Sequence, residues 1–164
     1  MLPLHCAITS PTQIEVVQLL VEITNYNSIN DQSKVNAETA LYRACTTSEC
    51  PRARAVVEYL LACKVPADVN LANNMGITCL MWAAILNDVK LAKLVVAHGA
   101  EVNASDHNNK TAIRHAAQRL YMAMLEYLRG LDLCLLRKTS ITSSGWSRKI
   151  HTLEIKRLKR SCRY

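Results

Sequence analysis

Phenylalanine is absent from this sequence of 164 residues, and aromatic residues make up only 5% of it. Half of the residues are nevertheless apolar, so small aliphatic side chains have to fill the interior. Contacts of that size favour closely packed helices. The length is enough for one domain with a real core, or for one domain and a tail.

Long apolar runs are also missing. No stretch approaches the roughly 18 to 20 uninterrupted apolar residues that a membrane-spanning helix requires. The opening MLPLHCAITSPTQIE has no basic start, no long apolar run and no small-residue cleavage site, so we expect no secretory signal. These absences predict an intracellular protein, located in the cytoplasm, with the nucleus as the alternative.

Motifs for metal binding and catalysis are missing as well. The seven cysteines have no paired spacing, which is typical of small buried residues in a reducing compartment. Zinc at Cys45 and Cys50 would need two further ligands, and no CxxC or HxxxH accompanies them. There is no GxxxxGK and no carboxylate pair, and the five histidines fall in different parts of the chain. We predict no metal site, no catalytic residue, no cofactor and no small-molecule substrate.

Charge is distributed unevenly along the chain. Residues 1–133 carry 11 Lys and Arg against 12 Asp and Glu, whereas residues 134–164 carry 9 against 1. The net charge of +7 therefore belongs to a basic tail that follows a nearly neutral body.

The sequence does contain a recurring unit of two short helices. An opener for the first helix recurs at LPLHCA (2–7), TALYRA (39–44), TCLMWA (78–83) and TAIRHA (111–116). An apolar second helix follows at VVQLLV (16–21), VVEYLL (56–61), LAKLVV (91–96) and MLEYLR (124–129). Polar exits close the helix pairs at INDQ (29–32), DVN (68–70) and EVN (101–103). One unit buries little apolar surface alone, so stacked neighbours have to supply a continuous core.

Single residues of the unit have predicted roles. Thr39, Thr78 and Thr111 are expected to cap the first helices. Gly76 and Gly99 are expected to adopt left-handed turns. Alanine pairs that allow close helix approach stand at 83–84 and 116–117. The predicted core between repeats combines Leu41, Leu80 and Ile113 of the first helices with Leu19, Leu60, Leu94 and Leu128 of the second helices.

Openers, second helices and exits recur together in order, and in this they resemble ankyrin repeats, whose 33-residue unit carries a TPLHxAA signature. The resemblance covers about residues 1–130. It implies an all-α solenoid of stacked helix-turn-helix units with short β-turn fingers. We expect an ankyrin-repeat domain at 1–133, with repeats at about 1–33, 34–72, 73–105 and 106–133. The basic Ser/Thr-containing tail at 134–164 is expected to be flexible or partly helical.

Three of the copies depart from a regular repeat. The first copy has no turn before its opener. The second copy has extra residues at 46–54, which loops of a solenoid tolerate. The fourth copy has Leu120 where a glycine between the two helices is expected.

In proteins similar to this one, partner contacts come from residues beside the turn glycine and from the end of the first helix. Carried over, this predicts contacts to a protein partner at Asn36, Glu38, Asn74, Met75, Ile77, Trp82, Ile85, Leu86, His107, Asn108, Lys110, Gln118 and Arg119. The residues from Met75 to Leu86 in this set are apolar and predict an exposed patch in a concave groove. The alternative for Trp82 and Leu86 is packing against Tyr42 and residues 46–54. The basic residues around His107 predict an acidic group on the partner.

The tail carries candidate targeting residues at Arg148, Lys149, Lys156, Arg157, Lys159 and Arg160. Three interpretations stay open for them. They are a nuclear-localisation or nucleic-acid patch, an amphipathic helix at an anionic membrane, or a solvated end.

The sequence therefore predicts a non-catalytic protein-protein interaction module or adaptor that uses the groove and fingers of its repeats. A narrower resemblance, carried by RAC at 43–45 and TCLM at 78–81, is to feminization-type substrate receptors of cullin-based ubiquitin ligases. It implies recognition of a degradation signal, although no cullin-binding box is evident. The remaining alternative is a regulatory factor that its tail directs to the nucleus, to nucleic acid or to a membrane surface.

Overall fold

Eight helices form within the residues that the computed structural model describes, which are 3–9, 14–25, 27–47 and 51–138. In chain order they are α1 (Pro3–Thr9), α2 (Ile14–Ile23), α3 (Ala40–Thr46), α4 (Pro51–Ala62), α5 (Cys79–Leu86), α6 (Val89–Ala97), α7 (Ala112–Gln118) and α8 (Met122–Lys138). The β structure within the same ranges is one isolated antiparallel bridge between Ser105 and Thr111. The all-α architecture expected from the sequence is confirmed.

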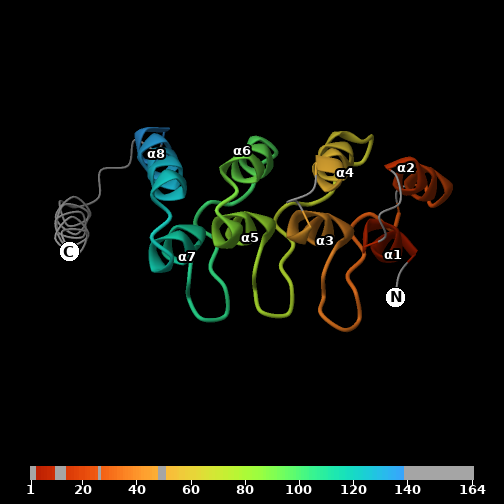
Figure 1. Ribbon diagram of the computed structural model, residues 1–164, viewed down its shortest axis with the longest axis horizontal. Helices are drawn as coiled ribbons and strands as arrows, with labels where there is room; N and C mark the ends of the chain where they lie inside the picture. The colour runs from red at the N-terminus through yellow and green to blue at the C-terminus, as the bar shows by residue number, and fades with distance from the viewer. Residues whose placement is uncertain (1–2, 10–13, 26, 48–50, 139–164) are drawn as a thin grey trace. The chain divides into compact units, whose positions relative to one another are not determined.

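The chain divides into two compact units, Met1–Asp132 and Leu133–Tyr164. Within the first unit, α1, α3, α5 and α7 form one row, and the second helices of the repeats form another row beside it (Figure 1). Long loops before α3, α5 and α7 extend from the opposite side of the first row. The second, third and fourth repeats therefore each present a first helix and a loop on the side away from the second helices. The predicted domain limits stay a prediction, and α8 continues to Lys138.

Threonines begin two of the first helices as predicted. The Thr39 hydroxyl accepts from the backbone N–H of Tyr42 at 3.1 Å, and Thr78 accepts from that of Met81 at 3.4 Å. Each such bond satisfies a backbone donor that the first turn of a helix leaves free, worth about 1 kcal/mol. Thr111 has the same extended backbone but makes no side-chain capping bond, so that part of the prediction is wrong.

The core runs between successive first helices, because α5 packs against both α3 and α7. The alanines at 83, 84 and 116 are fully buried, which keeps these helices close. Leu41, Leu80, Leu60 and Leu128 are also buried as predicted, whereas Leu94 and Ile113 are only partly buried.

Leu19 contradicts the predicted core, because its side chain is 57% exposed. Val17 and Val21 of the same helix are buried instead. They stand four residues apart and so share one face, and a residue two positions from either of them lies on the far side of the helix. Packing of α2 against α1 and α4 selects the valine face.

Residues in left-handed conformation mark equivalent turns in the repeats. Ala37, Gly76 and Asn109 each stand two residues before the threonine that precedes a first helix, and their φ angles are +51°, +77° and +54°. Leu120 has a φ of +58°, so the backbone there needs the conformation that the expected glycine would supply. A leucine in that region costs about 1 to 2 kcal/mol relative to glycine.

Asparagines in the exits join one repeat to the next. The Asn30 side-chain oxygen accepts from the N–H of Asp68 at 2.8 Å, and Asn70 accepts from the N–H of Glu101 at 2.8 Å. Asn70 also donates to the carbonyl of Gly99 at 3.2 Å. These bonds place the exits of neighbouring repeats in a fixed register.

Candidate functional site

Three fingers precede the first helices of the second, third and fourth repeats, and they occupy residues 33–38, 73–77 and 106–110. The first of them is closed by a backbone bond from the N–H of Ser33 to the carbonyl of Glu38 at 2.9 Å. The corresponding bonds in the other two fingers span one residue less. The finger at 33–38 therefore has one extra residue in its turn.

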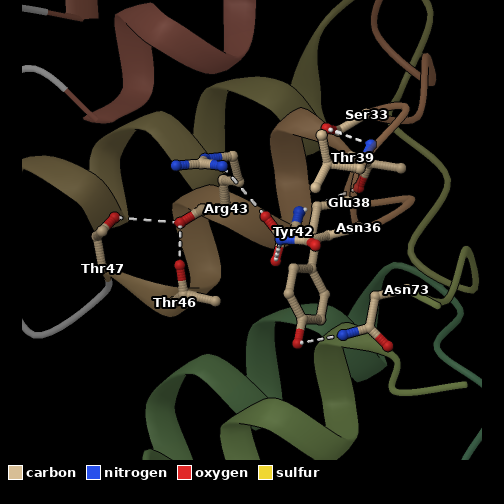
Figure 2. Close-up of polar contacts among 10 residues, drawn as sticks. Ser33, Asn36, Glu38, Thr39, Tyr42, Arg43, Thr46, Thr47 and Asn73 are labelled. Carbon is tan, nitrogen blue, oxygen red and sulfur yellow. Dashed lines mark hydrogen bonds and ion pairs between the residues drawn. The ribbon is translucent and has the colours of Figure 1, made fainter. Parts of the chain in front are cut away.

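Asn73 organises the finger at 73–77. Its side-chain oxygen accepts from the N–H groups of Met75 and Ile77 at 2.9 and 3.0 Å. Its amide nitrogen donates to the hydroxyl of Tyr42 in α3 at 3.0 Å (Figure 2). One asparagine therefore folds its own finger and attaches it to the preceding repeat.

Asp106 has the equivalent position in the finger at 106–110. One of its oxygens accepts from the N–H groups of Asn108 and Lys110, both at 2.8 Å. The other oxygen meets the imidazole of the buried His115 at 3.0 Å. Burial by itself would raise the pKa of Asp106, but the two N–H groups and His115 outweigh it and lower the pKa.

The three fingers are bonded into one row. The N–H of Asn74 donates to the carbonyl of Asn36 at 2.9 Å, and its side-chain amide donates to the carbonyl of Val35 at 2.8 Å. The N–H of His107 donates to the carbonyl of Met75 at 3.0 Å. Neighbouring finger tips are consequently held side by side by main-chain groups, and we call these three loops the finger row.

Gly76 makes the close contact between two fingers possible. A Cβ atom at this position would lie 2.8 Å from Cδ2 and 2.9 Å from the backbone nitrogen of His107. Its φ of +77° also lies in the left-handed region. Two independent constraints therefore require glycine here, whereas the sequence indicated only the turn.

The tips of the finger row carry both apolar and polar exposed side chains. Met75 is 63% exposed and Val35 is 77% exposed. The exposed polar residues of the predicted contact set are Asn36, Asn74, His107, Asn108, Gln118 and Arg119. Exposed side chains of mixed polarity suit contact with a protein partner, because interfaces between proteins combine apolar and polar contacts on an open surface.

The predicted apolar patch is smaller than expected. Ile77 is buried, with 9% of its surface exposed. Its backbone N–H donates to the side-chain oxygen of Asn73, which turns the chain back toward α5. Ile85 and Leu86 are half-buried. Of the predicted apolar group, Met75 is the exposed member within the described residues.

Trp82 packs against Tyr42, with ring centroids 5.8 Å apart and an interplanar angle of 52°. Its indole N–H is buried and has no acceptor among the residues that the structure describes. A partner molecule cannot reach this nitrogen while the side chain is packed in this way. The geometry thus follows the packing alternative for Trp82.

One charged member of the contact set, Glu38, is paired within the fold. Glu38 is half-buried and forms an ion pair with Arg43 at 3.2 Å, and the amide of Asn36 stands 3.5 Å from the same carboxylate (Figure 2). Lys110 is half-buried, and its backbone N–H is bonded to Asp106.

The sequence did not single out Asn73, Asp106 or His115. A signal was present, since Asn73 and Asp106 each stand five residues before the threonine that precedes a first helix. Short side-chain acceptors at such positions commonly bond to backbone N–H groups two residues ahead.

Several predictions concern other parts of the chain. The targeting residues from Arg148 to Arg160, and Cys50, lie outside the described residues. Among the described residues, no group of three or more His, Cys, Asp or Glu is placed to hold a metal ion. In that same part of the chain, no helix is long and apolar enough to cross a membrane. The resemblance to ubiquitin-ligase receptors stays a prediction.

Comparison with known proteins identifies a family and a relative. The family model for ankyrin repeats matches residues 51–136 with three copies, and this is just over half of the chain. The chain is also similar to the probable 26S proteasome regulatory subunit p28 of Saccharomyces cerevisiae, with 24% identity over 155 residues. That match covers 93% of this chain and 64% of the relative. The chain thus spans less than two thirds of the relative's length.

Proposed function

The chain belongs to the ankyrin-repeat family, and from that premise we propose that it is a non-catalytic adaptor whose finger row binds a protein partner. Ankyrin repeats are protein-interaction modules. Proteins of this class present a rigid, extended surface made by successive repeats. The proposal therefore concerns where on this chain the partner is bound and by which side chains.

The observation that carries the proposal is the continuity of the finger row around Met75. The main chain of this residue is fixed by its own finger and by the neighbouring His107, yet its side chain is 63% exposed. A flexible apolar side chain on a rigid backbone can fill a pocket of a partner with little loss of main-chain freedom. Met75 is thus the proposed anchor.

The polar part of the surface favours an acidic group beside the anchor. His107 in the finger at 106–110, Arg114 on α7 and Arg119 directly after α7 are all exposed. The positive charges of Arg114 and Arg119 would speed association and orient a partner carrying Asp or Glu, with a smaller contribution to affinity.

We infer further that the partner is a subunit of the 26S proteasome, because the relative in Saccharomyces cerevisiae is named as a regulatory subunit of that assembly. Binding is expected to reside in residues 1–133, so removal of residues 139–164 should leave it intact. If the truncated chain loses binding, the tail takes part and the proposed division of the chain fails.

The test is sedimentation of the full chain with purified 26S proteasome through a glycerol gradient. Wild type should migrate with the proteasome, and Met75→Asp should stay at the top. Met122→Asp is a matched control, because Met122 is 61% exposed but lies at the start of α8. It should migrate as wild type does.

Circular-dichroism melts of both variants should match wild type, since neither side chain is buried. Co-migration of Met75→Asp would remove the finger row from consideration. If both variants lose binding, an added surface charge by itself prevents binding, and Met75 is not the anchor. Absence of binding by wild type would overturn the proteasome assignment.

A further inference from the structure

The second helix of the first repeat exposes an apolar stripe. Val16, Leu19 and Ile23 of α2 are 38%, 57% and 68% exposed. Their spacing of three and four residues places them along one face of the helix over about two turns. We call these three residues the α2 stripe.

The α2 stripe is not required by the core of the repeat. The opposite face of the helix buries Val17 and Val21 completely or nearly so. A surface helix with one apolar face normally carries polar residues on the other. This helix therefore has a second apolar face whose function the packing of the repeats does not explain.

The helix α6 occupies the corresponding place in the third repeat and follows the usual pattern. It buries Leu91 and Val95, and it exposes Lys90 and Lys93. An apolar outer face like that of α2 is therefore absent from α6 and is not a general property of second helices in this chain.

Acidic residues border the α2 stripe. Glu15 stands four residues before Leu19 and Glu22 three residues after it, and both carboxylates are on exposed residues. Residues at these separations are neighbours on a helix surface. Glu15 and Glu22 are the charged residues of α2, so the helix itself carries negative charge only.

We propose that the α2 stripe binds an amphipathic helix of a protein partner, one whose apolar face is flanked by Lys or Arg. An amphipathic helix laid along an apolar face is a common mode of recognition, with anchors at helical spacing. Leu19 at the centre of the stripe is the principal anchor, and Glu15 and Glu22 pair with the basic residues of the partner. This surface belongs to the row of second helices, and the finger row projects from the row of first helices (Figure 1).

The charge pattern selects this occupant over two others. In a symmetric dimer through the α2 stripe, the same acidic residues of both copies would meet, and like charges brought together disfavour the contact. A membrane surface rich in anionic lipids would repel Glu15 and Glu22 in the same way.

The test uses a fluorescein-labelled synthetic peptide of about 18 residues, long enough to form a helix, with Leu at helical i, i+3, i+4 and i+7 positions and Lys beside them. Fluorescence anisotropy with the full chain should show saturable binding. A twin peptide with Glu in place of every Lys should not bind. Binding of the Lys peptide should weaken as salt is raised.

Two sets of variants locate the binding surface. Leu19→Asp and the milder Leu19→Ala should each weaken binding, the first by about tenfold or more because it places a charge against an apolar anchor. Glu15→Gln combined with Glu22→Gln should weaken binding less and remove most of its salt dependence. Val35→Asp is the control, because Val35 is even more exposed but lies in a finger.

Three results would overturn the proposal. They are failure of the Lys peptide to bind wild type, equal binding of the Glu peptide, or unchanged binding by Leu19→Asp. Light scattering and flotation with phosphatidylserine vesicles test the other occupants. A dimer, or vesicle binding, that Leu19→Asp abolishes would assign the α2 stripe to that occupant instead. Thermal melts should be unchanged in all variants, since every substituted side chain is exposed.

Discussion

The fingers at 73–77 and 106–110 have the same backbone but attach it to different parts of the protein. In each of them, one side-chain oxygen accepts two backbone N–H groups. The remaining polar atom of Asn73 reaches Tyr42 in the preceding repeat, whereas that of Asp106 reaches His115 in its own repeat. A turn that is locally identical can therefore either couple two repeats or stabilise one.

The two fingers also differ in charge. Asn73 is neutral at every pH, so the coupling of the second and third repeats through Tyr42 does not depend on its titration. Asp106 is ionised near neutral pH, and its bonds are strongest in that form. Acid should therefore weaken the finger at 106–110 before it weakens the finger at 73–77.

The largest effect is expected where the two fingers touch. Gly76→Ala should lower the free energy of unfolding by about 2 to 4 kcal/mol, because a left-handed alanine is strained and its Cβ collides with the backbone of His107. Gly99→Ala is the matched control, since Gly99 has a φ of +88° but open space around it. It should cost only about 1 kcal/mol. Urea titration measures both, and equal losses would contradict the proposed contact between fingers.

Removal of the carboxylate should have the next largest effect. Asp106→Ala leaves the N–H groups of Asn108 and Lys110 and the imidazole of His115 without their partner, which should cost about 1 to 3 kcal/mol. Asp106→Asn keeps an oxygen acceptor in the manner of Asn73 and should cost less. If both variants are equally unstable in urea, the charge of Asp106 matters more than its geometry.

The pH dependence of stability should separate the two fingers further. The pKa of Asp106 is lower in the folded protein than its usual value near 3.9, so its stabilisation is present above about pH 4. It is lost as the pH falls through the folded-state pKa. The difference in free energy of unfolding between wild type and Asp106→Asn should thus shrink as the pH is lowered from about 5 to about 2, when unfolding is followed by urea titration. A constant difference would contradict the assignment.

The smallest effect is expected for the link between repeats. Tyr42→Phe removes the acceptor of Asn73 but keeps the ring contact with Trp82, and should cost about 1 kcal/mol. Burial also raises the pKa of the Tyr42 hydroxyl, which keeps it protonated. Tyr127→Phe is the control, because the ring of Tyr127 would still meet the ammonium of Lys93. If Tyr42→Phe and Tyr127→Phe lower the melting temperature equally, the hydrogen bond from Asn73 adds nothing to stability.

The sequence was a good guide where one residue's own chemistry sets the local structure. Thr39 and Thr78 cap helices, and Gly76 adopts a left-handed turn, because a short hydroxyl or a missing Cβ favours those states in any context. The same reasoning predicted a capping bond from Thr111 that does not form, although Thr111 does stand at the start of α7. A residue type indicates what a position can do, and the neighbouring atoms decide whether it does so.

The sequence was a poor guide to which apolar side chains are exposed. Leu19 and Val17 are both aliphatic residues of one helix, and Ile77 and Met75 are both apolar residues of one finger. The structure buries Val17 and Ile77 and exposes the other two. The rotation of α2 and the path of the finger depend on contacts with α1, α4 and Asn73, which are not encoded in the periodicity of a short segment.

The sequence by itself determined the repeat, its helix pairs and the left-handed turns at Gly76 and Gly99, because these follow from local propensity and from the period of about 33 to 39 residues. Only the tertiary structure decided that the fingers form one bonded row, that Met75 is the exposed member of the predicted apolar group, and that α2 has a second apolar face. Those features arise from hydrogen bonds and packing between residues about 30 to 40 positions apart, where the energy depends on geometry that forms only when the repeats stack.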